Sequence, residues 1–306
     1  MASKYRVTII VPVYGDWPSL KDCIKSLKVN IDSKLHKVLL VNDCGPDADS
    51  VGYRIKKSIK GFDNFEYRRN KKNLGFVGTC NRAVFELDKT NNDILLLNSD
   101  TITTNGFIEE MSHVLHGSSK NGAVSPRSNN ATIATIPLSA AAQKGLDPDG
   151  SYRIYKRIKS KLSRSTVVPV VHGFCILIKR DLIKKYGLFD EIFGKGYGEE
   201  VDFCLRIRSK GYLSLLANWA YVFHLEAKSF TLEAKKKYIE ENNKIIWARY
   251  PDYRQSVREY MERALVREAA IEKSALSNTV FILTTKAKGI IRRNKTVDRL
   301  IRKLRE

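Results

Sequence analysis

Cysteine is scarce in this 306-residue chain, and its distribution is irregular. The five cysteines are odd in number, widely scattered and without the short spacings typical of zinc sites. Such a set does not fit a disulfide framework and indicates reduced thiols in a cytosolic compartment. They are Cys23, Cys44, Cys80, Cys175 and Cys204.

Long apolar runs and targeting segments are also missing. No signal-peptide pattern precedes Tyr5, and the longest apolar stretch near the C-terminus, residues 280–283, is far too short to cross a bilayer. We therefore expect a cytoplasmic protein that is not integral to a membrane. The chain also contains no clear internal repeat.

Acidic residues are in deficit, with 33 Asp and Glu against 54 Lys and Arg, a formal charge of +21. The surplus is uneven, because residues 275–306 hold nine basic and two acidic residues. This pattern predicts an amphipathic helix that binds an anionic membrane surface, so that the protein lies peripherally on the inner face of the cell membrane. The alternative is a basic helix packed on the protein itself or on a partner. The apolar face comprises Ile290, Val297, Leu300, Ile301 and Leu304.

The most informative run is LLLNSDT at residues 95–101, in which three leucines end in a polar cluster. Taken alone it also fits a strand followed by an ordinary turn. Two further apolar strands, at residues 7–13 and 38–41, likewise end in polar or turn residues, and a helix is expected at residues 18–29. Alternation of this kind predicts an α/β fold in which Asp100 lies at the carboxyl edge of a mainly parallel sheet, where ligands bind.

Several short motifs occur in one meaningful order along the chain. They are IVPVY (10–14), VND (41–43), NLGF with NRA (73–83), LNSDT (97–101), GLFDE (187–191), GEEVDF (198–203), and His224 followed by SF (229–230). Together they resemble the family-2 glycosyltransferases, inverting enzymes with the Rossmann-like GT-A fold. The most similar branch makes bacterial surface polysaccharides and includes rhamnosyltransferases.

The resemblance implies a set of donor-binding residues. Pro12, Tyr14 and Asp43 would line the pocket for the nucleotide base, and the Asp43 carboxylate would accept a hydrogen bond from a pyrimidine N–H. The resemblance places five residues next to the diphosphate. Two are glycines expected just before a helix, Gly75 and Gly78, and Asn81 follows them. The other two, Asn98 and Ser99, follow the apolar strand at residues 95–97. Arg82 is either an additional charge there or a solvated helix residue.

A divalent cation, Mg²⁺ or Mn²⁺, is implied at Asp100, with His224 as a further ligand. The motif departs from Asp-x-Asp because Asn98 takes the first position, which leaves one carboxylate to contact the metal. A histidine at the end of a strand is otherwise often structural.

The acidic cluster GEEVD places Glu199, Glu200 and Asp202 at the start of a helix expected over residues 201–210. Acids at a helix start are also favoured by the helix dipole alone. The resemblance implies that Glu200 is the general base, with Glu199 or Asp202 orienting the acceptor or metal. Because relatives carry Asp at this position, the longer Glu leaves Glu199 as an alternative base. His172, in a strand expected over residues 167–178, either touches substrate or is structural.

The expected organisation is a GT-A domain over residues 1–230, a helical extension over residues 231–273 and a basic tail over residues 274–306. The extension breaks near Pro251 and either packs on the core or forms a homodimer contact. Residues 125–169 are the least patterned segment, and they fit a mobile lid or a solvated insertion equally well.

These features predict a metal-dependent transfer of a sugar from UDP or dTDP to a hydroxyl of a glycan or lipid-linked acceptor. Three rival functions have discriminating features. A nucleic-acid-binding protein would explain the basic charge, but acids at strand ends would repel phosphate, so no nucleic-acid partner is expected. A nucleotidyltransferase would show a glycine-rich start with a signature lysine, which residues 11–17 lack. A noncatalytic module would bind donor without turnover.

Overall fold

A nine-stranded, mostly parallel sheet forms the centre of the part of the chain that the computed structural model describes, residues 5–138, 145–225 and 232–276. Its strand order is β3-β2-β1-β4-β8-β6-β9-β5, with β7 paired to β9. The parallel strands are β1 (Val7–Val13), β2 (Lys37–Asn42), β3 (Phe65–Arg69), β4 (Asp93–Leu97), β6 (Asn121–Arg127) and β9 (Leu213–His224). The antiparallel strands are β5 (Thr101–Thr103), β7 (Ser165–Val168) and β8 (Cys175–Ile178).

The central strands are apolar on both faces because helices cover both sides of the sheet. Strand β4 pairs with β1 through Ile10 and Leu96, and its residues 94–97 are at most 1% exposed. Pro12 pairs with Val41 of β2 and lies beyond the last pair that joins β1 to β4, so its missing N–H does not interrupt that ladder. The predicted α/β fold with a mainly parallel sheet is confirmed.

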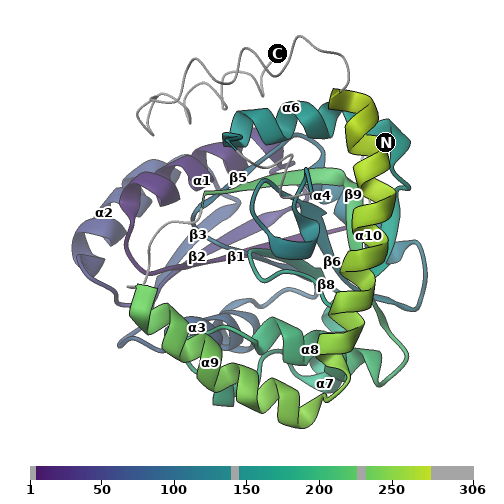
Figure 1. Ribbon diagram of the computed structural model, residues 1–306. Coiled ribbons are helices and arrows are strands. Elements are labelled where there is room, and N and C mark those ends of the chain that lie inside the picture. Colours follow the sequence, from purple (N-terminus) through teal and green to yellow (C-terminus); the bar gives the residue numbers. More distant parts are fainter. Residues whose placement is uncertain (1–4, 139–144, 226–231, 277–306) are drawn as a thin grey trace.

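Helices lie on both sides of the sheet (Figure 1). Two of them, α1 (Trp17–Asn30) and α2 (Ala48–Ile59), follow β1 and β2 on one side. On the opposite side lie α3 (Gly75–Arg82), α7 (Arg180–Tyr186) and α8 (Glu199–Arg208). Helix α4 (Phe107–His116) packs on β6 and β9, and a short π-helical segment, η1 (Ala83–Leu87), continues α3.

Residues 125–169 are more ordered than the sequence suggests. They contain the 3₁₀ turns η2 (Thr132–Ala134) and η3 (Lys159–Lys161), helix α6 (Pro148–Ile158) and strand β7. A second apolar cluster, with Ile154 and Tyr155 packed beside Phe223, fixes α6 to the sheet. The buried face of α6 contradicts the solvated insertion, and the mobile lid stays a prediction. The single strand expected over residues 167–178 is also wrong, because a loop separates β7 from β8.

The chain continues after residue 231 as two helices, α9 (Leu232–Arg249) and α10 (Tyr253–Leu276). They break at Pro251, as predicted, and pack on the core through Ile246, Tyr260 and Ala264. Among the described helices none has the length and apolar composition to span a bilayer. The predicted membrane-binding tail falls mostly in residues 277–306, outside the described residues.

Candidate active site

Asp100 and His224 face each other at one edge of the sheet. The turn that contains Asn98, Ser99 and Asp100 joins β4 to β5, and the register of β5 on β9 pairs Thr101 with His224. His224 Nε2 lies 3.6 Å from Asp100 Oδ1, and the two side chains are 11% and 13% exposed. Strands far apart in sequence therefore bring the two predicted metal ligands together.

The orientation of the His224 ring is fixed from behind. Its Nδ1 lies 2.7 Å from the carbonyl oxygen of Asn130, which only accepts, so Nδ1 carries the proton. The Asn129 side chain also binds both backbone groups of His224, at 2.9 Å each. In the neutral ring the lone pair of Nε2 therefore faces the Asp100 carboxylate, an arrangement of two acceptors that suits a shared cation. Sequence patterns gave no indication of Asn129 or Asn130.

The donor set around this pair is small. Within the described ranges, no group of three or more His, Cys, Asp or Glu side chains is placed to hold a metal. One carboxylate oxygen and one imidazole nitrogen are suitable ligands for a divalent cation, whose other positions water or a bound phosphate would fill. The residues present therefore fit a cation carried together with a phosphate ligand.

Residues 172–174 connect this pair to the acidic helix. The Phe174 ring stacks on His224 at 5.1 Å between centroids, and its carbonyl accepts from Asn98 N at 2.8 Å. The His172 ring lies 6.0 Å from that of His224. A Cβ placed on Gly173 would lie 3.4 Å from the Glu200 Cδ, so the glycine leaves room for this carboxyl. Glu200 therefore lies one short loop away from His224.

Helix α8 begins at Glu199, two residues earlier than predicted, so both glutamates lie in its first turn. Glu199 is 4% exposed, and no residue that the structure describes forms a hydrogen bond with its Oε2. Burial and the neighbouring Glu200 raise the Glu199 pKa well above its usual range. Burial also raises the pKa of Glu200. Backbone N–H groups, including that of Gly198, donate to its carboxylate and oppose this rise. The pair therefore favours a proton on Glu199 and an ionised Glu200.

Asp202 lies in a different setting, against α9. Its Oδ1 accepts from Arg249 Nη1 at 2.9 Å and from the Tyr250 hydroxyl at 3.0 Å, and its Oδ2 accepts from Arg206 Nε at 3.3 Å. The side chain is 1% exposed. These bonds engage both oxygens and tie Asp202 to protein partners, and its predicted contact with acceptor or metal stays a prediction.

Asp43 lies at the end of β2 with one carboxylate oxygen held in place. Its Oδ1 accepts from Asn70 Nδ2 at 2.7 Å and from the backbone N–H of Leu74 at 2.8 Å. No described residue bonds to Oδ2. Asn70 is in turn held by Arg82 Nη1 at 2.5 Å, so Arg82 acts on Asp43 through Asn70. The sequence analysis missed Asn70.

Tyr14 follows β1 and is 41% exposed. A Cβ on Gly45 would lie 2.7 Å from its ring carbon Cδ2, so only glycine fits beneath this ring. Pro12 lies two residues earlier within β1. Tyr14, Pro12 and Asp43 thus come from the ends of two adjacent strands, since Val13 pairs with Asn42.

Helix α3 begins at Gly75 and Gly78 is its fourth residue, so the prediction that both glycines precede the helix is wrong. Gly75 has a φ of +74°, and a Cβ there would lie 3.0 Å from the Gly194 carbonyl oxygen. The Asn81 amide is committed to the backbone of Phe189, donating at 2.9 Å and accepting at 3.2 Å. One N–H and the oxygen of the Asn81 amide therefore join α3 to the loop at Phe189, and the predicted place of Asn81 beside the diphosphate stays a prediction.

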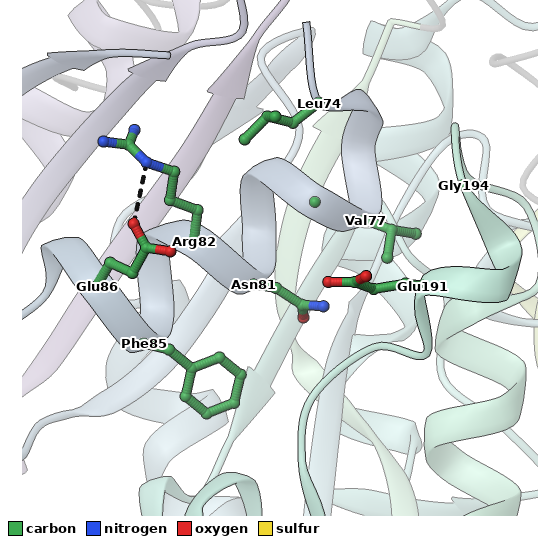
Figure 2. A pocket seen from close by; sticks show the side chains of 9 residues that line it. Leu74, Val77, Asn81, Arg82, Phe85, Glu86, Glu191 and Gly194 are labelled. Atoms are coloured by element: carbon green, nitrogen blue, oxygen red, sulfur yellow. Dashed lines mark ion pairs between the residues drawn. The ribbon is translucent and has the colours of Figure 1, made fainter. Parts of the chain in front are cut away.

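Figure 2 shows a cavity of about 510 Å³ beside α3. Of the predicted site residues only Gly78 and Asn81 line it, together with Glu191 and the ion pair that Arg82 makes with Glu86 at 3.2 Å. None of the predicted catalytic or metal-binding acids contributes to its wall. The cavity is thus separate from the acid-lined edge.

The predicted acids nevertheless belong to one region. Burial raises the pKa of the Cys80 thiol, and the charges of Glu199 and Asp43 raise it further, which places both carboxyls near this α3 side chain. A Cβ on Gly196 would lie 3.8 Å from Glu199 Oε2. The charges of Asp43 and Glu199 thus both act on Cys80 of α3, and the loop at residues 172–174 lies between Glu200 and the His224–Asp100 pair.

Three solved structures share this fold. A mannosyltransferase from Pyrobaculum calidifontis, solved with GDP-Man and Mn²⁺, aligns with 98% of this chain and 86% of its own at 15% identity and a TM-score of 0.59. S. aureus TarS with UDP-GlcNAc aligns over 96% and 83%, at 15% identity and a TM-score of 0.52. GalNAc-T7 with UDP, GalNAc and Mn²⁺ aligns over 92% of this chain but 57% of its own, at 12% identity and 0.59. At these identities the likeness shows the fold alone.

No curated protein matches the sequence significantly. The family model described as Glycosyl transferase family 2 matches residues 8–187, which is more than half of the chain. That span contains the β1, β2 and β4 ends with Asp43 and Asp100, and it stops before α8. The chain therefore belongs to glycosyltransferase family 2 and is a glycosyltransferase of the GT-A fold.

Proposed function

We propose that the protein is an inverting, divalent-metal-dependent glycosyltransferase that moves a sugar from a UDP- or dTDP-sugar to a hydroxyl group. The observation that carries this proposal is the pair of facing acceptors, Asp100 Oδ1 and His224 Nε2 at 3.6 Å, with the half-buried Glu200 and the buried Glu199 one loop away. A site of three acids and a histidine attracts a diphosphate only when a cation accompanies it.

Asp100 and His224 would hold the cation, and Asn98 and Ser99 would border the diphosphate. When bound, the metal neutralises the charge that develops on the departing diphosphate. Mg²⁺ prefers an all-oxygen shell, whereas Mn²⁺ accepts an imidazole nitrogen readily, so we expect Mn²⁺ to support activity better than Mg²⁺. Two of the three structural neighbours were solved with Mn²⁺, which is consistent with this expectation.

The nucleotide base would lie against Tyr14 and Pro12, with the N–H of a pyrimidine ring donating to Asp43 Oδ2. Asn70 and the Leu74 N–H hold the other oxygen, which fixes the orientation of the carboxylate. We propose that Gly75 and Gly78 approach the diphosphate with their backbone. Asn81 stays a proposed neighbour of the diphosphate, and one N–H of its amide donates to the Phe189 carbonyl.

Glu200 is the proposed general base. As the acceptor oxygen attacks the anomeric carbon, its proton passes to the Glu200 carboxylate and the bond from that carbon to the diphosphate oxygen breaks, which inverts the configuration. Glu199 is the weaker alternative because burial and the neighbouring Glu200 raise its pKa well above the usual range, which favours the protonated form that cannot accept a proton. Asp202 would act on the general base indirectly, because it joins α8, which carries Glu200, to α9.

The acceptor is proposed to be a glycan or a lipid-linked sugar in bacterial surface polysaccharide synthesis, as in the rhamnosyltransferase branch. A basic tail over residues 274–306 would then hold the protein peripherally at the cytoplasmic face of the membrane. Besides this tail, the proposed organisation has a catalytic domain over residues 1–230 and a helical extension over residues 231–273. A homodimer contact through the extension stays a proposal.

Calorimetric titration with UDP, dTDP and GDP, each with and without Mn²⁺, tests the proposal. UDP or dTDP should bind only with the metal, and D43N should weaken binding while leaving the affinity for GDP unchanged. Proton NMR of the product formed from an α-linked donor should show a β linkage. Metal-independent binding, a preference for GDP, or a retained configuration would each contradict the proposal.

A further inference from the structure

The loop that precedes Glu199 has an unusual backbone. After the 3₁₀ turn η4 (Glu191–Phe193), residues 194, 196, 197 and 198 all have positive φ, at +50°, +114°, +72° and +108°. Three of them are glycines, but Tyr197 has a side chain that disfavours this conformation. Such a backbone persists only when its surroundings hold it, and residues held in this way cluster at functional sites.

Asn242, on α9, supplies much of that hold. Its Nδ2 donates to the carbonyl oxygens of Gly196 at 2.8 Å and Tyr197 at 2.9 Å, and more weakly to that of Phe193 at 3.3 Å. The side chain is 8% exposed, so water does not replace these bonds easily. One turn later, Ile246 packs beneath the loop, where a Cβ on Gly198 would lie 3.5 Å from its Cγ1.

The end of α9 holds the two flanks of the same loop. Arg249 Nη1 donates to Asp190 Oδ2 at 2.8 Å and to Asp202 Oδ1 at 2.9 Å. Asp190 lies just before the loop and Asp202 lies in the helix that follows it. The Tyr250 hydroxyl adds a third bond, to Asp202 at 3.0 Å. Helix α9 therefore contacts this segment at its start, middle and end.

We propose that Asn242 is a positioning residue for catalysis, which sets the loop so that the Glu200 carboxylate is aimed at the acceptor hydroxyl. The inference rests on the proposed function and extends it to a helix outside the family-matched residues 8–187. Its physical basis is a chain of two hydrogen bonds. The Gly198 N–H donates to Glu200 Oε2 at 3.3 Å and so orients this carboxylate. The peptide group that carries this N–H also contains the Tyr197 carbonyl, to which Asn242 donates. Loss of these bonds would let the Glu200 carboxylate move away from the acceptor hydroxyl. The metal site and the pocket for the nucleotide base would stay unchanged.

The decisive variant is N242D, because Asp has the shape of Asn but its ionised carboxylate cannot donate to the three carbonyls. N243D is the matched control, since it makes the same charge change one residue along α9, at a half-buried side chain for which the described residues supply no hydrogen bond. Two readings are taken at pH 8. One is hydrogen exchange of peptides that cover residues 193–200, and the other is release of UDP from UDP-glucose and UDP-N-acetylglucosamine with Mn²⁺.

N242D should exchange faster than N243D in residues 193–200 and lose kcat by roughly 10–100-fold, with the KM for donor and the affinity for UDP with Mn²⁺ unchanged. Equal exchange in the two variants, or faster exchange with an unchanged kcat, overturns the inference alone. A wild-type protein that neither binds UDP or dTDP with Mn²⁺ nor releases either of them from a sugar donor overturns the proposed function. If N242D does not fold, N242S, which keeps one donor, is expected to give the same changes at smaller size, and its failure to do so is equally decisive.

Discussion

The buried imidazole of His36 should make the stability of this protein depend on pH. His36 immediately precedes β2 and is 1% exposed, and within the described part of the chain neither of its ring nitrogens has a hydrogen-bond partner. Burial lowers its pKa from 6.5 to about 4; the charge of Asp32 opposes this shift and that of Arg6 adds to it. The folded protein therefore keeps this ring neutral well below pH 6.

The direction and size of the effect follow from proton linkage. Between pH 6.5 and about 4 the unfolded chain binds a proton at His36 that the folded chain does not, so the free energy of unfolding falls as the pH falls. At 1.36 kcal/mol per pKa unit, this lost stability amounts to about 2 kcal/mol at pH 5 and about 3 kcal/mol near pH 4. Above pH 6.5 the stability contribution is fully present.

Urea unfolding followed by tryptophan fluorescence, at steps from pH 8 to pH 5, measures this loss. The variant H36L has a similar volume and no titrating group, so its free energy of unfolding should fall less than that of the wild type, by about 2 kcal/mol at pH 5. H113Q, which replaces an exposed histidine, is the control and should follow the wild type. Parallel wild-type and H36L curves over this range would refute the reasoning.

Three further predictions concern the site and the C-terminal helices. In thermal-shift assays, D100N should abolish the stabilisation by UDP with Mn²⁺, and H224A should weaken Mn²⁺ binding by roughly 10–100-fold, without lowering the melting temperature of the unliganded protein. E200Q should lose roughly 10²–10⁴-fold in kcat with UDP binding intact, and an unaffected kcat would exclude this residue as the general base. In the wild type, kcat should fall on the acid side of its pH profile with an apparent pKa above the ordinary glutamate value of 4.5, because burial raises the pKa of Glu200. R127M should lower the free energy of unfolding by about 3–5 kcal/mol, because it leaves the fully buried Glu268 without its bidentate partner, and adding E268L should restore part of that loss in urea unfolding.

The fold was predictable wherever the chain carries its own local signal. Apolar runs ending in turn residues identified β1, β2 and β4, and parallel pairing then fixed which ends of the strands share an edge. Helix α6 was missed although Asp147 and Pro148 form a standard helix start, with Asp147 Oδ1 accepting from Gly150 N at 2.6 Å. The surplus of basic residues in that segment hid the apolar positions Ile154 and Ile158, which lie four residues apart on the buried face.

The supporting residues of the site were not predictable from the sequence. Asn70, Asn129 and Asn242 bind a side chain or main-chain groups that lie 27 to 95 residues away, and asparagine carries no pattern that identifies such partners. The three acids of the GEEVD motif could have been separated by helix geometry. Glu199 and Asp202 are three residues apart and share the buried face of α8, whereas Glu200 lies about 100° around the helix.

The charge distribution links the site to its cofactor. The chain carries a net charge of +21, yet the region that would receive a diphosphate presents Asp43, Asp100 and Glu200, while Arg82 and Arg249 are turned to protein partners. Binding an anionic donor there without a cation would place like charges together, which a low-dielectric site penalises strongly. Metal and nucleotide should therefore each raise the affinity for the other by the same factor, as thermodynamic linkage requires. Titrating Mn²⁺ with and without UDP, and UDP with and without Mn²⁺, measures both factors, and D100N should bring both close to one.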